Sequence, residues 1–215
     1  MIQINKTSAP RSFITDLASG AKIYPDDLSR KGWSDLRISL LEDQGFICCY
    51  CQRRIPHNNT KNIIVKPKSK IEHFKCQDDN QDLQLVYENM FIACNGNIAT
   101  TNLTCDSKKD NSVLTKVNFS TPIEKVIYYT KNGQIKSNDS DLQKEIDEIL
   151  NLNDENLMKY RQSIYNVIER SKKTMGKLRG NYQHHLKREI KRWESKDNLG
   201  KFREYKGVGL YFLHK

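Results

Sequence analysis

The sequence predicts an α+β protein, in which a small unit of short strands, loops and one helix is embedded in a mostly α-helical chain. Two observations predict this class. Five of the six cysteines fall in two groups, at 48–51 and 94–105, within a stretch too irregular to form a good apolar core alone. The C-terminal half instead carries apolar residues at helical spacing. We therefore expect a helical segment that packs on the core, the core itself, and a β-hairpin followed by basic helices, at 1–45, 46–120 and 121–215.

The composition favours a protein of the cytosol. The 215 residues allow one large domain or two small ones. No apolar run approaches the ~18 residues that a membrane-spanning helix needs, and residues 1–13 lack the apolar stretch of a secretory signal. We expect a cytoplasmic protein with no membrane partner. In that reducing compartment, grouped cysteines bind metal more often than they form disulfides.

Local signals predict a helix before the cysteines and a hairpin after them. Ser34 is expected to cap a helix that presents leucines to the core and ends at Gly45. Between 123–129 and 134–136, Asn132-Gly133 supplies the positive φ of a tight turn. These elements would flank the cysteine-rich core on both sides.

The C-terminal helices are predicted from their capping residues and apolar stripes. Ser140 with Gln143 forms a capping box. The stripes that follow are interpreted as packing surfaces, and they comprise Leu142, Ile146, Ile149 and Leu150, then Leu157, Tyr160, Ile164, Val167 and Ile168, then Tyr182, Leu186, Ile190 and Trp193.

Positive charge is concentrated on the same helices. The formal net charge is +10, and residues 159–196 contain twelve Lys and Arg against three Glu, a local net of +9. A basic segment joined to a nearly neutral remainder predicts a surface that faces a polyanion. A solvated helix face remains the alternative, because charge alone does not distinguish the two.

The cysteine spacing predicts a structural zinc site. Cys48 and Cys51 form a C-x-x-C knuckle, and two thiolates at this spacing can bind one tetrahedral Zn²⁺ from a tight turn. Two further ligands are needed, and Cys94 and Cys105 are the available pair. Zn²⁺ would then replace the apolar core that this region lacks.

Other interpretations of the cysteines stay open. Cys49 could replace a neighbour as ligand, although it lies inside the knuckle, and Cys76 is best interpreted as an ordinary thiol. A lone C-x-x-C would equally suit buried free thiols or a redox pair. The second pair downstream favours metal.

A carboxylate and a histidine are adjacent between the two cysteine pairs. Glu72-His73 is flanked by Ile71 and Phe74, a pattern that fits an extended strand. Neighbouring side chains of a strand point to opposite faces unless a bend brings them together. The dipeptide gains meaning from its position inside the cysteine framework.

The order of these residues resembles the HNH nuclease motif, or ββα-metal motif, with four structural cysteines and a treble-clef-like core. The match spans roughly 46–110. The resemblance implies the His on a first strand, the Asn in the turn and second strand, and the last ligand on a helix. The residues that carry it are Cys48-x-x-Cys51, Glu72-His73, Asn89-Met90, Cys94 and Cys105-Asp106-x-x-Lys109.

The resemblance implies a metal-dependent DNA endonuclease and assigns the site residues. His73, neutral near pH 7, would be the general base that activates water. Glu72 and Asp106 would bind one Mg²⁺ or Mn²⁺, which stabilises the leaving group. Asn89 would orient the His73 imidazole or brace the loop. Lys109 would contact a phosphate oxygen.

The chain departs from the motif in two places. The last position is more often His or Asn, and here it is Asp106; an added negative charge should tighten a hard cation. The long 94–105 spacing leaves the register of Asp106 open. His57, after the knuckle, is expected to be a surface histidine.

Features outside the motif resemble the Septu-type (PtuB-like) HNH subunits. This resemblance implies the effector nuclease of a bacterial anti-phage defence complex with an ABC-type ATPase (PtuA-like), some of them associated with retrons. The chain has no G-x-x-x-x-G-K-[ST] loop, so any ATP would bind to that partner. The resemblance rests on Trp33, the Cys-x-Tyr-Cys form, Ile71-Glu72-His73-Phe74, Cys105-Asp106-Ser107-Lys108-Lys109, Leu150-Asn151-Leu152-Asn153 and a following helix with Arg161.

Two alternatives remain at this point. A stand-alone restriction- or homing-type HNH nuclease keeps the chemistry and changes the biology. A non-catalytic zinc module that binds nucleic acid or a partner also explains four cysteines and a basic surface. The enzyme alone explains Glu72-His73, Asn89 and Asp106 together.

Overall fold

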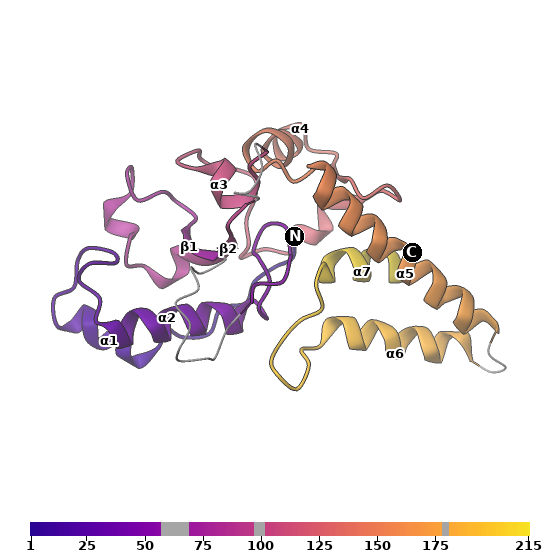
Figure 1. Cartoon of the computed structure of the whole chain (residues 1–215), viewed down its shortest axis with the longest axis horizontal. Coiled ribbons are helices and arrows are strands. Elements are labelled where there is room, and N and C mark those ends of the chain that lie inside the picture. Colours follow the sequence, from indigo (N-terminus) through magenta and orange to yellow (C-terminus); the bar gives the residue numbers. More distant parts are fainter. Residues whose placement is uncertain (57–68, 97–101, 178–180) are drawn as a thin grey trace.

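The predicted α+β class is confirmed. The computed structural model describes residues 1–56, 69–96, 102–177 and 181–215 (Figure 1). Within these ranges the chain forms seven α-helices and two separate two-stranded antiparallel sheets. No helix in the described ranges combines the length and apolar character that crossing a membrane requires.

Two helices form the N-terminal region. α1 (Arg11–Ala18) packs against α2 (Arg30–Asp43), and α2 in turn contacts the sheet of the core. The helix cap is Ser29 rather than the expected Ser34, because the Ser29 hydroxyl accepts a hydrogen bond from the Gly32 amide at 2.9 Å. The helix ends before Gly45, as expected.

Gly45 adopts a left-handed conformation with φ +58. A Cβ at this position would lie 2.9 Å from the Phe202 backbone nitrogen and closer still to its ring. The Gly45 carbonyl also accepts a hydrogen bond from that nitrogen. A glycine is therefore required where the C-terminal segment crosses the end of α2.

A strand–strand–helix unit forms the centre of the molecule. β1 (Ser69–His73) pairs antiparallel with β2 (Met90–Cys94), and Glu72 lies opposite Phe91. The short 3₁₀ turns Gln81–Leu83 and Tyr87–Asn89 connect the strands. α3 (Cys105–Lys109) packs against β2 (Figure 1).

The predicted hairpin is present but shorter than expected. Its strands are β3 (Ile127–Tyr129) and β4 (Ile135–Ser137), because Ile123–Lys125 forms a 3₁₀ turn instead of extending the first strand. Gly133 in the turn has φ +86, and a Cβ there would meet the Met158 carbonyl oxygen at 2.1 Å. Both the turn and the close approach of the helix that contains Met158 thus require glycine.

The helices after the hairpin begin at α4 (Ser140–Lys144), which continues into a π-helical turn at Glu145–Ile149. The cap of α4 is Asp139, whose carboxylate accepts from the amides of Asp141 and Leu142. The expected capping box at Ser140 was therefore misplaced by one residue.

Three longer helices complete the chain: α5 (Glu155–Lys177), α6 (Tyr182–Glu194) and α7 (Lys206–Leu213). α7 contacts both α5 and α6 (Figure 1). The α5 stripe buries Leu157 and Ile168, whereas Tyr160 and Val167 are more than half exposed. The α5 stripe is therefore a packing surface only in part, since Tyr160 and Val167 do not contribute to the core.

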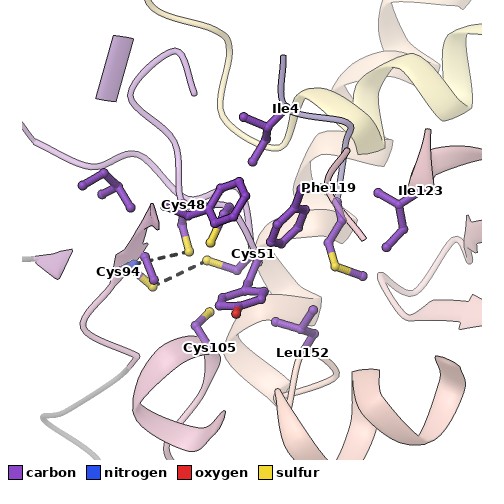
Figure 2. Packing of buried hydrophobic residues seen from close by; sticks show 14 of the residues in the cluster. Ile4, Cys48, Cys51, Cys94, Cys105, Phe119, Ile123 and Leu152 are labelled. Atoms are coloured by element: carbon purple, nitrogen blue, oxygen red, sulfur yellow. Dashed lines mark hydrogen bonds between the residues drawn. The ribbon is translucent and has the colours of Figure 1, made fainter. Parts of the chain in front are cut away.

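Buried hydrophobic side chains from the seven helices and from β2, β3 and β4 belong to one cluster, and Ile71 of β1 packs against it. The cysteines lie inside it, next to Ile4, Phe119 and Leu152 (Figure 2). Arg161 of α5 is also buried, and its guanidinium donates to the carbonyls of Gly133 and Leu152. The hairpin and α5 are thereby joined to the same core that surrounds the cysteines.

Candidate metal centre and adjoining acidic cavity

Four cysteines converge on one point in the core. The sulfur atoms of Cys48, Cys51, Cys94 and Cys105 lie within 4.8 Å of one another, and all four side chains are buried (Figure 2). The Cys51 and Cys94 sulfurs are 3.7 Å apart. Tetrahedral Zn²⁺ with four thiolates at about 2.3 Å places its sulfurs about 3.8 Å apart. The cluster can therefore hold a metal such as zinc, on the four residues that the sequence predicted.

Backbone hydrogen bonds explain why these sulfurs meet. The Gln52 amide donates to the Cys48 carbonyl and folds the knuckle into a tight turn. The Cys94 amide, at the end of β2, donates to the Cys48 sulfur at 3.3 Å. Cys105 opens α3 in a left-handed conformation, and its amide donates to the Leu150 carbonyl. The knuckle thus supplies two ligands, the end of β2 supplies one and the start of α3 supplies one.

The other two cysteines are outside the cluster. The Cys49 amide donates to the Ile92 carbonyl, which ties the knuckle to β2, and its sulfur is not among the four. The Cys76 sulfur donates to Asp79 at 3.3 Å. Cys76 is therefore an ordinary thiol, in line with the sequence analysis.

The pKa values of the clustered thiols differ strongly. Burial raises the pKa of Cys48 well above its usual value. Hydrogen bonds from Cys105, Cys48 and Cys94 lower the pKa of Cys51 well below its usual value. The buried cluster thus stabilises negative charge on one thiol at the expense of the others, and a divalent cation would favour the thiolate form of all four.

Tyr50 connects the knuckle to the first strand. The side chain lies between two of the ligands in sequence and is fully buried. Its hydroxyl donates to the Glu72 carboxylate at 2.8 Å. This contact was not predicted, although a hydroxyl-bearing aromatic inside a C-x-x-C knuckle was visible in the sequence.

Glu72 lies in a network of buried charges. Only 2% of Glu72 is exposed, and its Oε1 is 3.0 Å from the Lys109 ammonium. The Asp106 carboxyl is within hydrogen-bond distance of Glu72 and forms an ion pair with Lys70 at 3.1 Å. Burial and the Asp106 contact raise the pKa of Glu72 to about 8. Burial acts against ionisation of Asp106 as well, but the Glu72 hydrogen bond and Lys70 lower its pKa overall. The contact between the two carboxyls thus raises the pKa of Glu72 and lowers that of Asp106.

An adjoining cavity of about 250 Å³ brings most of the predicted site residues together. It is lined by Glu72 and His73 of β1 and by Asp106 and Lys109 of α3. Asn89 is not among its lining residues. Asp106 and Lys109 lie on α3, whose first residue, Cys105, belongs to the cysteine cluster, so the cluster adjoins this side of the cavity.

His73 is buried and held in one orientation. Its Nε2 atom is 2.9 Å from the Gln84 carbonyl oxygen, and its ring meets the edge of Tyr24 at a centroid distance of 4.8 Å. Burial lowers the pKa of His73 below its usual value, so the imidazole is neutral at pH 7. A neutral imidazole that donates from Nε2 keeps the lone pair of Nδ1 as a proton acceptor. The partners Gln84 and Tyr24 were not predicted.

Asn89 braces the loop between the strands. Its side-chain oxygen accepts from the Lys75 amide at 2.8 Å, and its amide nitrogen donates to the carbonyls of Lys75 and Leu83. Leu83 precedes Gln84, the residue that holds His73. Of the two expected roles, Asn89 fulfils the bracing one, and it acts on the imidazole through the loop.

The position of Lys109 differs from the expected phosphate contact. The side chain is 1% exposed, and its ammonium contacts Glu72 and, at 3.4 Å, the His73 carbonyl. A buried carboxylate requires a counter-charge, and Lys109 provides it from the same helix that carries Asp106. The expectation for His57 lies outside the described residues.

Comparison with known proteins does not assign the chain to a family. No protein-family model matches the sequence, and no curated protein matches it. The fold and the site define an α+β protein with a buried four-cysteine cluster that can hold a metal such as zinc and an acidic cavity beside it.

Proposed function

We propose that this protein is a metal-dependent endonuclease of the HNH type, which hydrolyses phosphodiester bonds in DNA from a ββα-metal core. The observation that carries the proposal is the single cavity, beside the four-cysteine centre, that gathers His73, Glu72 and Asp106. A neutral base and two carboxylates in one small cavity are what hydrolysis of a phosphodiester requires of a protein.

The donor set of the cavity fits a hard divalent cation. Glu72 and Asp106 offer carboxylate oxygens in mutual contact, and two like charges at that distance favour a cation between them. Mg²⁺ or Mn²⁺ held there would supply Lewis-acid stabilisation of the scissile phosphate and the leaving 3′ oxygen. Zn²⁺ would be held apart from the reaction by the four cysteines.

The chain's own residues supply the remaining steps. His73 accepts a proton from water at Nδ1, since Nε2 is engaged by the Gln84 carbonyl. Tyr50 and Lys109 hold the Glu72 carboxylate in place from two directions. Both are positioning residues, because they act through Glu72.

Cleavage by a His73→Ala variant tests the proposal. The full chain is incubated with Mg²⁺ or Mn²⁺ on plasmid and on single-stranded DNA, alone and with products of its neighbouring genes. We expect His73→Ala to lower the cleavage rate by about 10²-fold or more, while the control His184→Ala, exposed on α6, keeps the parental rate. Equal rates for the two variants would overturn the assigned base.

A non-catalytic zinc module that binds nucleic acid or a partner is the second candidate. It is favoured by the ammonium groups of Lys109 and Lys70, which already neutralise the two carboxylates. In the described part of the chain, only the four cysteines form a group of three or more metal-ligating side chains. Titration of the zinc-loaded chain with Mn²⁺, followed by electron paramagnetic resonance, separates the two. Binding that Asp106→Asn abolishes supports the enzyme, and no binding supports the module.

The biological setting proposed is a bacterial, cytoplasmic anti-phage defence complex with an ABC-type ATPase, with or without retron components. A stand-alone restriction- or homing-type nuclease is the alternative. The test is co-purification with the product of an adjacent ATPase gene, together with cleavage that depends on ATP. Full activity of the isolated chain without ATP supports the stand-alone enzyme.

A further inference from the structure

A basic cavity of about 600 Å³ lies at the C-terminal end of α6. It shares no lining residue with the Glu72 cavity. Among its described lining residues, seven are Lys or Arg, and Asp197 is the single carboxylate. α6 and the turn after it contribute Arg188, Lys191, Arg192 and Lys196, and the segment that returns toward α7 contributes Lys201 and Arg203 (Figure 1).

The seventh cation, Arg54, connects this basic cavity to the metal centre. Arg54 follows the knuckle in the sequence, and it forms a β-bridge with Ile47, which precedes the knuckle. Its guanidinium donates to the carbonyls of Gly45, Phe46 and Phe202. The floor of the cavity is therefore fixed to the core rather than carried on a free loop.

The loop that closes the cavity is folded by its own acidic residue. The Asp197 carboxylate accepts from the backbone amides of Leu199 and Lys201, at 2.9 and 2.8 Å. Both amides donate to the same oxygen, Oδ1. Because Asp197 is the single carboxylate of the lining, most of the positive charge around it is not neutralised. The local charge of the lining is +6, from seven cations and one carboxylate.

The cations of the cavity have few acidic partners within the described residues. Arg192 forms an ion pair with Glu189 at 2.9 Å. Arg203 and Lys201 lie over the rings of Trp193 and Phe46 instead of against carboxylates. Arg188 and Lys191, a helical turn apart on α6, have no ion pair in the described part of the chain. Cations gathered in this way repel one another and attract a polyanion.

The aromatic residue in the cavity wall indicates which part of a polyanion would bind. The Lys196 and Lys206 ammonium groups lie over the Phe202 ring, 5.2 and 3.4 Å from its centroid. Both ammonium groups hold positive charge at the ring, which favours phosphate groups as ligands. The cavity therefore suits phosphate groups rather than bases.

We propose that this cavity binds consecutive backbone phosphates of a nucleic-acid strand, at a site separate from the Glu72 cavity. The identity of the polyanion rests on the proposed nuclease function. Binding of this kind is independent of base sequence and weakens as salt rises, because each neutralised phosphate releases a counterion. The site would hold a strand while chemistry takes place in the other cavity.

The double variant Arg188→Ala/Lys191→Ala tests the proposal in a His73→Ala chain, which separates binding from cleavage. Affinity for labelled single-stranded and duplex oligonucleotides is measured over a range of salt concentrations. We expect Kd to rise roughly tenfold or more, and the slope of log Kd against log salt to fall by about two. The matched control Lys173→Ala/Lys187→Ala removes the same charge from exposed positions outside the cavity, and we expect a change of less than about twofold.

Equal weakening by the two double variants would overturn the site, since it would show a general effect of net charge. Unchanged affinity would overturn it as well. Inorganic tripolyphosphate serves as a second ligand: cavity-dependent binding of it, with no effect on oligonucleotides, assigns a small polyphosphate and overturns the nucleic-acid strand. Loss of cleavage in every condition, with cavity-dependent DNA binding retained, rejects the nuclease and keeps this site.

Discussion

The cysteine-rich core and the C-terminal helices differ in the burial of their ion pairs. In the core, Lys109 and Glu72 are nearly inaccessible to solvent and contact each other directly. On the helices, Lys159 and Glu155 form an ion pair in which both side chains are largely exposed. Breaking a buried pair leaves an uncompensated charge in a medium that solvates it poorly, whereas water replaces a lost surface partner. The buried ion pair of the core suits a reaction site, and the exposed charges of the helices suit binding to a large charged ligand.

The largest effect is expected at the metal centre, where Cys51→Ser removes one of four converging sulfurs. A structural metal site contributes its binding free energy to folding. We expect loss of bound zinc and a fall in the free energy of unfolding of about 3 kcal/mol or more. Zinc content and urea denaturation measure the two quantities.

Cys76→Ser is the matched control for that substitution. The Cys76 thiol donates to Asp79 outside the cluster, so zinc content should stay at the parental level with a stability loss under about 1 kcal/mol. A parental chain without bound zinc, together with equal stability losses for Cys51→Ser and Cys76→Ser, would identify the four cysteines as buried free thiols.

A direct comparison of the two regions comes from removing one lysine in each. Lys109→Met leaves the buried Glu72 carboxyl without its counter-charge, and we expect a loss of about 3–5 kcal/mol in the free energy of unfolding. Lys159→Met breaks an ion pair in which 65% of the lysine side chain is exposed, and we expect no measurable change in melting temperature. Similar losses in the free energy of unfolding for both variants would show that burial does not make the core ion pair more important for stability.

The smallest effect is expected from Tyr50→Phe, which removes a single hydroxyl. Glu72 loses one hydrogen bond and keeps Lys109, so the free energy of unfolding should fall by about 1 kcal/mol. For a nuclease, kcat should fall while KM stays constant, because Tyr50 positions Glu72 without touching substrate. Tyr128→Phe, exposed on β3, is the control. A kcat equal to that of the control would leave Tyr50 with a structural role alone.

Local sequence signals predicted the existence of elements better than their starting points. Ser29 and Asp139 cap the helices where Ser34 and Ser140 were expected. Several residues near each helix start can serve as caps, and the choice depends on where tertiary contacts begin the helix. The hairpin turn was easier to predict, because the positive φ that it needs is a local property that Gly133 supplies.

The basic surface shows how charge along a sequence becomes charge in space. Residues 159–196 carry a local net charge of +9, but the basic cavity uses only the end of that segment. It adds Lys201 and Arg203 from the following loop and Arg54 from beyond the knuckle. Arg54 lies far from the other residues in the sequence, so only the fold could bring all of them together.

Spacing in the sequence was enough to predict which four cysteines converge, because ligand chemistry restricts which residue types can meet around a metal. The resemblance to the HNH motif singled out Glu72, His73 and Asp106, and these three line one cavity. The tertiary structure decided the rest. It placed Lys109 on Glu72, the Gln84 carbonyl on His73, and Arg54 in the wall of the basic cavity. These contacts join residues from different elements, and they arise because each buried polar group must find a partner where the core has excluded water.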